Sequence, residues 1–339
     1  MMEQTNLYID EILSQYFLAG SWVTRAGESG ANNTTRFVTV DAEKFVLRIY
    51  ETHQDVEKVQ YEHTILTALA ELPLPFSIPM PVQTRDGKTM LRTKDGKIAS
   101  LFRYMEGVNP VLDSLAEIHC YGRTAGILSD TLAYVQVNQQ PAYRPYYEID
   151  STHPRCSIQD VLSFSKNPPR EFSELTTELQ VIYEQLASFM EQVPHLRQLP
   201  HQLVHGDLNA SNILVNEKEE VSAILDFEFV TKDLRVMELA VCLSDFIQPS
   251  KVSGITWAKI NAFLTGYGKS LKLTEAEIEA VPVLIQLRSL DVFIHFLGRY
   301  WDQVSSIEIV KEYIQKSAVR CNWIVDHKIK LLTLCHDLL

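Results

Sequence analysis

The chain has 339 residues, a length that predicts about two domains, or two lobes around a cleft. Hydrophobic residues make up 46% and charged residues 22%, an ordinary globular balance that excludes a disordered, collagen-like or membrane-bundle chain. Acidic residues outnumber basic ones by 43 to 31, and the net charge of −12 argues against a nucleic-acid-binding surface; it favours a cationic or amine-bearing partner, although excess acid also serves solubility.

The start of the chain carries no sign of export. Residues 1–10 include Glu3 and Asp10 and no basic residue before an apolar stretch, unlike a secretory signal. No window approaches the roughly 18 uninterrupted apolar residues that cross a bilayer. We therefore expect a cytoplasmic protein with no membrane partner. The five cysteines are odd in number and form no C-x-x-C, which predicts buried free thiols.

The first third of the chain alternates between helical and strand-like periodicity. Apolar residues at helical spacing over 7–18 predict an opening amphipathic helix. A second helix is expected over 55–70, with Asp55 as its N-cap and the prolines from Pro73 onward ending it. Short runs rich in β-branched and aromatic residues predict five antiparallel strands, at 22–25, 36–40, 44–50, 89–93 and 98–104.

The strand pattern stops at residues 105–110, where we place a hinge between two lobes. The expected fold is α+β, with a five-stranded antiparallel sheet plus a helix in residues 1–104 and a mainly helical lobe in residues 105–339. One short hairpin, formed by 213–215 and 221–225, is expected to be the only interruption of the helices. Helical patterns cover 112–134, 171–193, 236–246, 256–267, 275–301 and 307–338.

The strongest chemical signal is a polar loop between apolar flanks. His205-Gly206-Asp207 is followed by Asn212, and Asp226 comes at the end of the expected hairpin. An Asp and an Asn separated by four residues also arise by chance in turns and helix caps. Phosphoryl transfer, however, needs a carboxylate to orient and deprotonate a hydroxyl and oxygen ligands for Mg²⁺, and this set supplies both. The pattern therefore predicts a kinase-type active site.

These residues make the chain resemble the aminoglycoside phosphotransferase and choline kinase superfamily, and within it the homoserine kinase type II branch. The resemblance implies a protein-kinase-like two-lobed fold and covers nearly the whole chain. Residues 1–104 would then be the nucleotide-binding lobe, and residues 105–339 would carry the catalytic loop and the acceptor site. The segments that carry the family resemblance are 203–214, 224–229 and 237–240, and further matches lie at 96–101, 105–107 and 115–119.

The resemblance assigns roles within the polar loop. Asp207 would be the catalytic base or the carboxylate that orients the acceptor, and His205 would support the loop from behind. Asn212 and Asp226 would hold Mg²⁺, and ATP would be the phosphoryl donor. Glu228, two residues beyond Asp226, is a further metal or substrate candidate that also fits a surface carboxylate.

The N-terminal lobe contributes candidates for nucleotide binding. Arg48 stands where kinases place a phosphate-binding lysine, and Glu62 in the following helix could pair with it; a lone strand arginine also fits a solvent-facing charge. Residues 28–35 have no G-x-G-x-x-G, yet Asn32 and Thr34 could help to cover phosphates, if the turn is more than a hairpin loop. Phe102 and Tyr104, on the expected hinge strand, would contact adenine or belong to the core.

The acceptor is expected to bind against the helix over 275–301. Steps of three and four residues place Arg288 and several other polar residues on one face of this otherwise apolar helix, which therefore lines a cleft or faces solvent. The proposed substrate residues are Asp291, His295, Arg299, Tyr300 and Trp301, together with Asn209 in the polar loop.

The expected activity is transfer of the γ-phosphoryl of ATP to a hydroxyl of a small, amine-bearing metabolite, as in homoserine kinases. Aminoglycoside, choline, hydroxylysine and methylthioribose acceptors stay open, because these relatives share the motif. A non-catalytic binding or coat-like protein of this fold is the alternative from another class. A protein kinase is disfavoured, since the loop lacks the Arg of H-R-D. The sequence leaves open whether the protein is a monomer or a homodimer.

Overall fold

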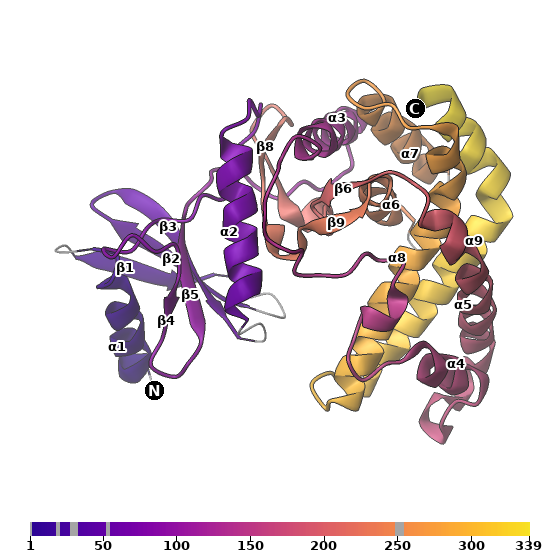
Figure 1. Cartoon of the computed structure of the whole chain (residues 1–339), viewed down its shortest axis with the longest axis horizontal. Helices are drawn as coiled ribbons and strands as arrows, with labels where there is room; N and C mark the ends of the chain where they lie inside the picture. Colours follow the sequence, from indigo (N-terminus) through magenta and orange to yellow (C-terminus); the bar gives the residue numbers. More distant parts are fainter. Residues whose placement is uncertain (1, 18–20, 28–32, 52–54, 248–253) are drawn as a thin grey trace.

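The structure is a computed structural model that describes residues 2–17, 21–27, 33–51, 55–247 and 254–339. A β-sheet with two helices forms one lobe, and a larger, mostly helical lobe lies beside it (Figure 1). Helix α2 (Val56–Ala70) stands between the sheet and the helical lobe. The predicted α+β, protein-kinase-like fold is confirmed.

In the described part of the chain, the N-terminal sheet has five antiparallel strands in the order β1-β2-β3-β5-β4. The prediction of five strands is confirmed. The strand β2 begins at Asn33 rather than at residue 36, because residues 33–35 pair with the end of β3. The helix α1 ends at Leu13, earlier than the predicted residue 18. The elements are α1 (Met2–Leu13), β1 (Trp22–Ala26), β2 (Asn33–Val40), β3 (Glu43–Tyr50), β4 (Leu91–Arg92) and β5 (Ile98–Arg103).

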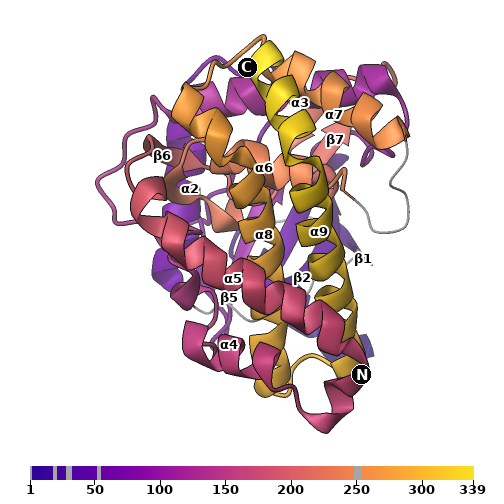
Figure 2. The same ribbon diagram turned by 90° about the vertical axis from the view of Figure 1, so that its right-hand side faces the viewer.

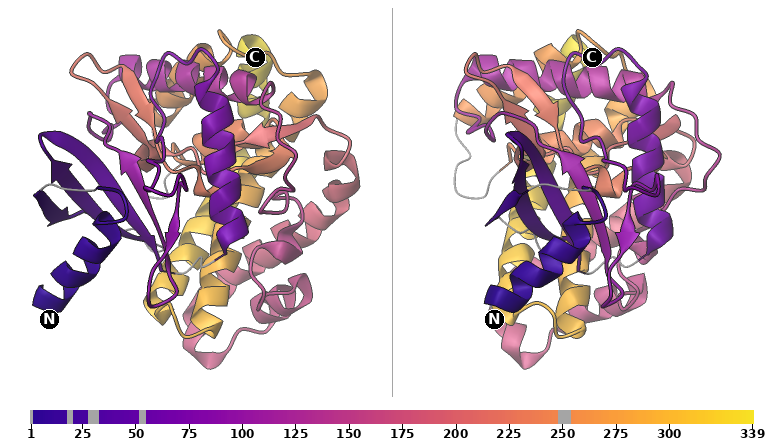
Figure 3. Two further views of the ribbon diagram at one scale, coloured as in Figure 1. Left: turned by 60° about the vertical axis from the view of Figure 1, so that its left-hand side comes forward. Right: turned by 90° about the vertical axis from the view of Figure 1, so that its left-hand side faces the viewer.

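The two faces of this sheet pack against different partners. Side chains alternate along a strand, so Leu47 and Ile49 of β3 share a face, which packs against α1, while Arg48 points to the opposite face. Figure 3 shows α1 and α2 on opposite sides of the sheet. The predicted N-cap of α2 is confirmed, since the Asp55 carboxylate accepts a hydrogen bond from the Glu57 amide at 2.9 Å. Arg48 therefore faces the helical lobe.

The larger lobe is built on long helices, two of which run side by side while a third crosses them (Figure 2). The helices α5, α8 and α9 pack together, as Figure 2 shows, and both α8 and α9 begin and end at the predicted residues. Residues 170–175 form a 3₁₀ turn, so α5 begins later than predicted. The helices are α3 (Leu115–Leu132), α4 (Ile158–Lys166), α5 (Thr176–Leu196), α6 (Met237–Ser244), α7 (Gly254–Tyr267), α8 (Glu275–Trp301) and α9 (Ile307–Leu338).

The described part of this lobe also contains four short strands. The predicted hairpin is present as β7 (Ile213–Val215) and β8 (Val221–Ile224). The prediction that it alone interrupts the helices was wrong, because β6 (His201–Val204) pairs antiparallel with β9 (Thr231–Leu234). The strands β6 and β9 have four residues each, too few to show a clear period. Together the pairs bracket the polar loop, which lies between β6 and β7.

The helix α8 is long and apolar enough, by length and composition, to cross a membrane. Most of its residues are buried among the other helices, as expected for the core helix of a globular protein. The five cysteines all lie in described segments and are free; four of them are buried, as predicted, whereas Cys120 is half-buried.

Candidate active site

His205 ties the polar loop to the end of β8. Its ring is fully buried, and its Nε2 lies 2.8 Å from the carbonyl oxygen of Leu225. A carbonyl can only accept, so Nε2 carries the proton, and Nδ1 accepts the Asp207 amide at 3.3 Å. This arrangement agrees with the expected supporting role of His205 behind the loop.

Gly206 lets the loop turn sharply beside residue 229. Its φ of +83° lies in the left-handed region, and a Cβ there would meet the carbonyl oxygen of Phe229 at 2.7 Å. The Tyr146 hydroxyl donates to the Gly206 carbonyl at 2.6 Å, and the buried Glu238 carboxylate accepts the His205 amide. Helix α6 and the segment 133–157 therefore hold the loop from both sides.

Asp207 presents its carboxylate at the centre of the site. The Asn212 Nδ2 donates to Asp207 twice, to the carbonyl at 2.8 Å and to Oδ2 at 3.1 Å. The Asp207 Oδ1 forms an ion pair with Arg288 of α8. The Asp207 side chain is 20% exposed, so it is held on two sides while a ligand can still reach it.

Asn212 and Asp226 lie together at the open end of the β7–β8 hairpin. The Leu225 amide donates to the Asn212 carbonyl at 2.8 Å, which brings the next residue, Asp226, beside Asn212. Asp226 has φ +60° and Oδ1 3.1 Å from the Nη1 of Arg48. Glu228 is buried and accepts from the Asn33 side chain at 2.8 Å, so it is not the surface carboxylate that the sequence left open.

Arg48 connects the sheet to this group. Its Nη1 lies 3.1 Å from Asp226 and 3.4 Å from Glu62 of α2, as the sequence predicted for the Arg48–Glu62 pair. The Tyr50 hydroxyl donates to the other Glu62 oxygen at 3.2 Å. Burial raises the pKa of Glu62 to about 7, and Arg48 opposes that rise. The solvent-facing alternative for Arg48 is wrong, because its side chain is 17% exposed and pairs inward.

The structure gives less support to the other residues proposed to bind the nucleotide. Asn32 lies outside the described residues. The Thr34 hydroxyl donates to Glu51 at 2.8 Å. Phe102 is buried in the hydrophobic core, with Arg48 5.5 Å from its ring centroid, which agrees with the core alternative left open by the sequence. The Tyr104 amide donates to the Lys44 carbonyl at 3.1 Å, which leaves only the Tyr104 carbonyl to meet an adenine.

The structure divides the proposed acceptor residues along α8. Arg288 lies at Asp207, and Asp291 lies beside Arg288, with its Oδ1 accepting the Thr152 hydroxyl at 2.7 Å. His295 lies about two turns beyond Arg288, with its ring centroid 6.2 Å from that of His153. Asn209, in the loop itself, uses its carboxamide within the loop, accepting the Ser211 amide and donating to the Asp207 carbonyl.

The last three candidates are not brought to Asp207. Arg299 donates to Ser305, and Tyr300 and Trp301 pack edge-on against Phe172 and Phe164. Eleven residues at 1.5 Å each put Arg299 about 16 Å along the axis from Arg288. These side chains lie on the same helix as Arg288 but make their contacts at its C-terminal end.

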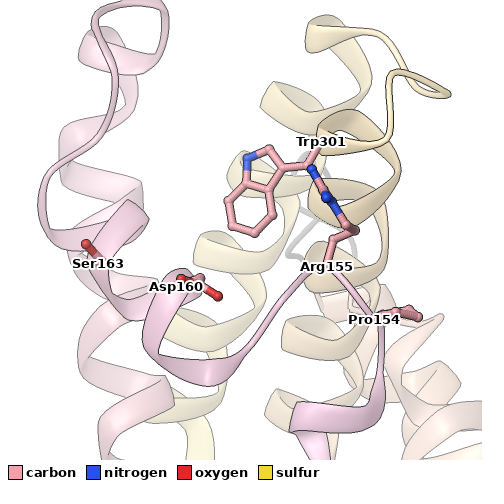
Figure 4. A pocket seen from close by; sticks show the side chains of 5 residues that line it. All are labelled: Pro154, Arg155, Asp160, Ser163 and Trp301. Carbon is pink, nitrogen blue, oxygen red and sulfur yellow. The ribbon is translucent and has the colours of Figure 1, made fainter.

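Trp301 borders an open hollow of about 500 Å³ at that end of α8. Figure 4 shows it between Trp301 on one side and Asp160 on the other. Its remaining lining residues are Pro154, Arg155 and Ser163. The hollow contains none of the polar loop, so the chemistry places the active site elsewhere, at Asp207.

Sequence reasoning missed the residues that support the loop from a distance. Tyr146, Glu238 and Asp245 contact the loop, the last by accepting the Ala210 amide at 3.0 Å. Residues 237–240 already carried part of the family resemblance, and that was the one signal for Glu238. Within the described residues, no group of three or more His, Cys, Asp or Glu side chains is placed to hold a metal ion.

The chain has two kinase-like lobes with Asp207, Asn212 and Asp226 gathered between them. This arrangement is typical of phosphotransferases. The model of the phosphotransferase enzyme family, known as APH, matches residues 23–256. The chain belongs to this family.

Known proteins agree with this assignment. A homoserine kinase from Bradyrhizobium diazoefficiens is 28% identical over 295 residues, which cover 84% of this chain and 82% of that protein. The structure of a microcompartment-associated aminopropanol kinase matches with a TM-score of 0.68 at 16% identity, over 95% of this chain and 97% of the other. An amicoumacin kinase in complex with AMP-PNP and Ca²⁺ matches with a TM-score of 0.65 at 15% identity, over 94% and 96%. The expected enzyme class, a small-molecule kinase, is confirmed.

Proposed function

We propose that this enzyme transfers the γ-phosphoryl group of ATP to a hydroxyl of a small, amine-bearing metabolite, with L-homoserine as the first candidate. The observation that carries the proposal is the Asp207 carboxylate, partly exposed and fixed by Asn212 on one side and Arg288 on the other. The similarity to a homoserine kinase and the acidic net charge support the choice of acceptor. Aminoglycoside, choline, hydroxylysine and methylthioribose acceptors are the alternatives to be tested beside it.

The residues at the hairpin end fit Mg²⁺ as the partner of ATP. Both hydrogen bonds from Asn212 to Asp207 use its nitrogen, so its Oδ1 is the end suited to a cation. The Asp226 Oδ1 is buried and balanced by ion pairing with Arg48, without a hydrogen bond. Magnesium at such sites takes one or two carboxylates plus substrate phosphates, so a complete protein cage is not required. Asn212 and Asp226 would hold it, with Glu228 as a further oxygen donor, and it would neutralise phosphate charge.

The chain's own groups account for the rest of the reaction. The Asp207 carboxylate would accept the proton of the acceptor hydroxyl as the new bond from that oxygen to the γ-phosphorus forms and the bond to the β-phosphate oxygen breaks. Arg48, held by Glu62, would bind phosphate oxygens of ATP as they enter. ADP and the phosphorylated acceptor are the products.

An ADP-release assay with ATP and Mg²⁺ tests the function. We expect turnover with L-homoserine and a loss of at least about 100-fold in kcat for Asp207→Asn, because general-base catalysis typically contributes that much. Nucleotide affinity, measured by calorimetry, should stay unchanged. Asp302→Asn is the matched control, since Asp302 also pairs with an arginine, Arg155, but at the far end of α8. Full activity of Asp207→Asn would refute the mechanism, and turnover of another acceptor alone would replace L-homoserine.

The lobe boundary and the setting of the protein are also part of the proposal. The strand β5 ends at Arg103, and the Val108 amide already bonds to Val215 of the hairpin at 3.1 Å. Residues 104–107 therefore connect the two lobes, which supports the boundary at 104/105 and the hinge. We propose a cytoplasmic enzyme, monomeric or homodimeric, that acts on small molecules rather than on nucleic acids or membranes.

A further inference from the structure

We propose that Arg288 and Asp291 select an acceptor that carries a carboxylate and an ammonium group beside its hydroxyl, and that Arg288 reads the carboxylate. The inference deepens the proposed function and rests on it. It makes Arg288 a residue that determines specificity, in addition to positioning Asp207.

Arg288 holds its guanidinium directly beside the proposed base. One nitrogen, Nη2, pairs with Asp207 Oδ1, while Nη1 donates to the Tyr146 hydroxyl at 2.8 Å. The same Nη1 lies 3.8 Å from Oδ2 of Asp291. The Tyr146 hydroxyl in turn donates to the Gly206 carbonyl, so the guanidinium is oriented by the catalytic loop itself. A ligand held by Arg288 would therefore lie within reach of Asp207.

The contacts of Arg288 differ from those of a structural arginine in the same chain. Arg235 binds one carboxylate, Glu277, with two parallel hydrogen bonds, from Nε at 2.8 Å and from Nη2 at 2.5 Å. Arg288 instead divides its contacts among an aspartate, a hydroxyl and a second, more distant aspartate. A guanidinium offers five N–H donors and prefers to bind a carboxylate through two parallel hydrogen bonds. Arg288 therefore has N–H groups left to bind a further carboxylate.

The charge around Arg288 favours an amine in the same place. Among the described residues, the carboxylates of Asp207, Asp291 and Asp245 face Arg288, and Arg320 is the second cation beside them. Carboxylates outnumber arginines in this largely buried region. Asp291 is 17% exposed, and its Oδ2 lies beyond hydrogen-bond distance of Arg288, so it can accept an ammonium group. A zwitterion satisfies both Arg288 and Asp291 and adds no net charge.

The spacing limits the acceptor to a compact molecule. Asp207 and Asp291 both approach the same guanidinium, so the hydroxyl site and the amine site are separated by about one side chain. An acceptor with its hydroxyl a few bonds from an α-amino and α-carboxylate centre matches this arrangement. The geometry therefore points to a hydroxy-α-amino acid.

Three acceptors that differ by one group test the inference. L-Homoserine has all three groups, 3-aminopropan-1-ol lacks the carboxylate, and 4-hydroxybutanoate lacks the amine. We expect wild-type kcat/KM for L-homoserine to exceed both others by about 100-fold, the usual cost of losing a charged hydrogen-bonding partner. Arg288→Met should remove the preference for L-homoserine over 3-aminopropan-1-ol. Asp291→Asn should weaken the preference over 4-hydroxybutanoate.

The ratio between acceptors separates specificity from a general loss of activity. Arg288→Met will also disturb Asp207, which lowers turnover of every acceptor, so only a change in the ratio supports carboxylate reading. A parallel fall for all three acceptors would overturn the inference and leave the kinase function standing. Arg288→Lys keeps the charge and should keep part of the preference, which covers the case in which the methionine variant does not fold. Arg155→Lys, in a distant Arg–Asp pair, is the control and should leave the ratios unchanged.

Binding provides a second measurement. With ADP and Mg²⁺ present, calorimetry should detect L-homoserine on the wild type and a loss of affinity of about 100-fold for Arg288→Met. Equal wild-type affinity for L-homoserine and 3-aminopropan-1-ol would overturn the inference. If none of the three compounds binds or reacts while nucleotide still binds, both this inference and the choice of L-homoserine fail. Turnover of another acceptor would then show that the phosphotransferase itself is sound.

Discussion

Two arginines with little exposure pair with carboxylates where the chemistry is expected. Arg48 meets Glu62 and Asp226, and Arg288 meets Asp207. Removing one partner of such a pair leaves an uncompensated buried charge, which costs more than the pair contributes when intact. The residues of the site are therefore coupled, and substitutions among them will not add independently.

Glu62 makes stability depend on pH. Its pKa is raised from 4.5 to about 7, so between these values the folded protein keeps a proton that the unfolded chain releases. The free energy of unfolding should then fall as pH rises from about 4.5 to 7, by up to about 3 kcal/mol for this group. Glu62→Gln cannot titrate, so its urea-unfolding free energy should lose this part of the fall. An identical pH dependence in both proteins would contradict the prediction.

The sequence predicted the residues of the polar loop because they are neighbours along the chain. Asp207 and Asn212 are five positions apart and meet through a local hydrogen bond. The partners of the loop could not be predicted in the same way. Arg288 lies 81 positions from Asp207, and Glu238 lies 33 positions from His205, so only packing brings them together.

At the scale of elements, glycines allow the close crossing of α3 and α7, and Gly122 and Gly266 make the closest approaches. A Cβ at Gly266 would lie 2.1 Å from the carbonyl oxygen of His119, and a Cβ at Gly122 would lie 2.1 Å from that of Phe263. Real Cβ atoms do not approach backbone oxygen so closely, so the helices touch through their backbones. Helical periodicity predicted both helices but gave no indication of this contact.

Gly266→Ala should therefore destabilise the protein. The clash with backbone, which cannot yield as a side chain would, should outweigh the gain of about 1 kcal/mol from alanine's helix propensity. We expect a net loss of about 2 kcal/mol in urea unfolding. The matched control is Gly254→Ala in the same helix, where no atom lies within 4 Å of the added Cβ and the change should stay within about 0.5 kcal/mol. Equal effects of the two substitutions would show that the crossing tolerates a side chain.

Across the whole molecule, the two lobes meet at the expected metal site. Arg48 from the sheet contacts Asp226, and Asn33 from β2 contacts Glu228. The helix α2 packs against the turn 227–229, which contains Glu228 and directly follows Asp226. Nucleotide and metal would therefore bind where the lobes already touch and should stabilise the whole chain.

Saturating AMP-PNP with Mg²⁺ should raise the melting temperature by a few degrees. Binding at about 100 times the dissociation constant stabilises a protein by about 2.7 kcal/mol. Chelating the metal should remove most of the shift. Asp226→Asn should lose the metal-dependent part, because the amide keeps the left-handed backbone of residue 226 but lacks the charge. Asp207→Asn is the control and should keep the full shift; a wild-type response from Asp226→Asn would argue against its role as a metal ligand.

The sequence by itself determined the order of the main elements, the ends of α8 and α9, and the polar loop, because periodicity, caps and local motifs act over a few neighbouring residues. It did not determine the β6–β9 pair, whose strands are too short to show a period, and it did not predict the helix α4. Along α8, the helical spacing placed six candidates on or near one face. Only the tertiary structure decided that Arg288 and Asp291 lie at the catalytic loop while Tyr300 and Trp301 pack at the far end, because that depends on which other elements cover each turn of the helix.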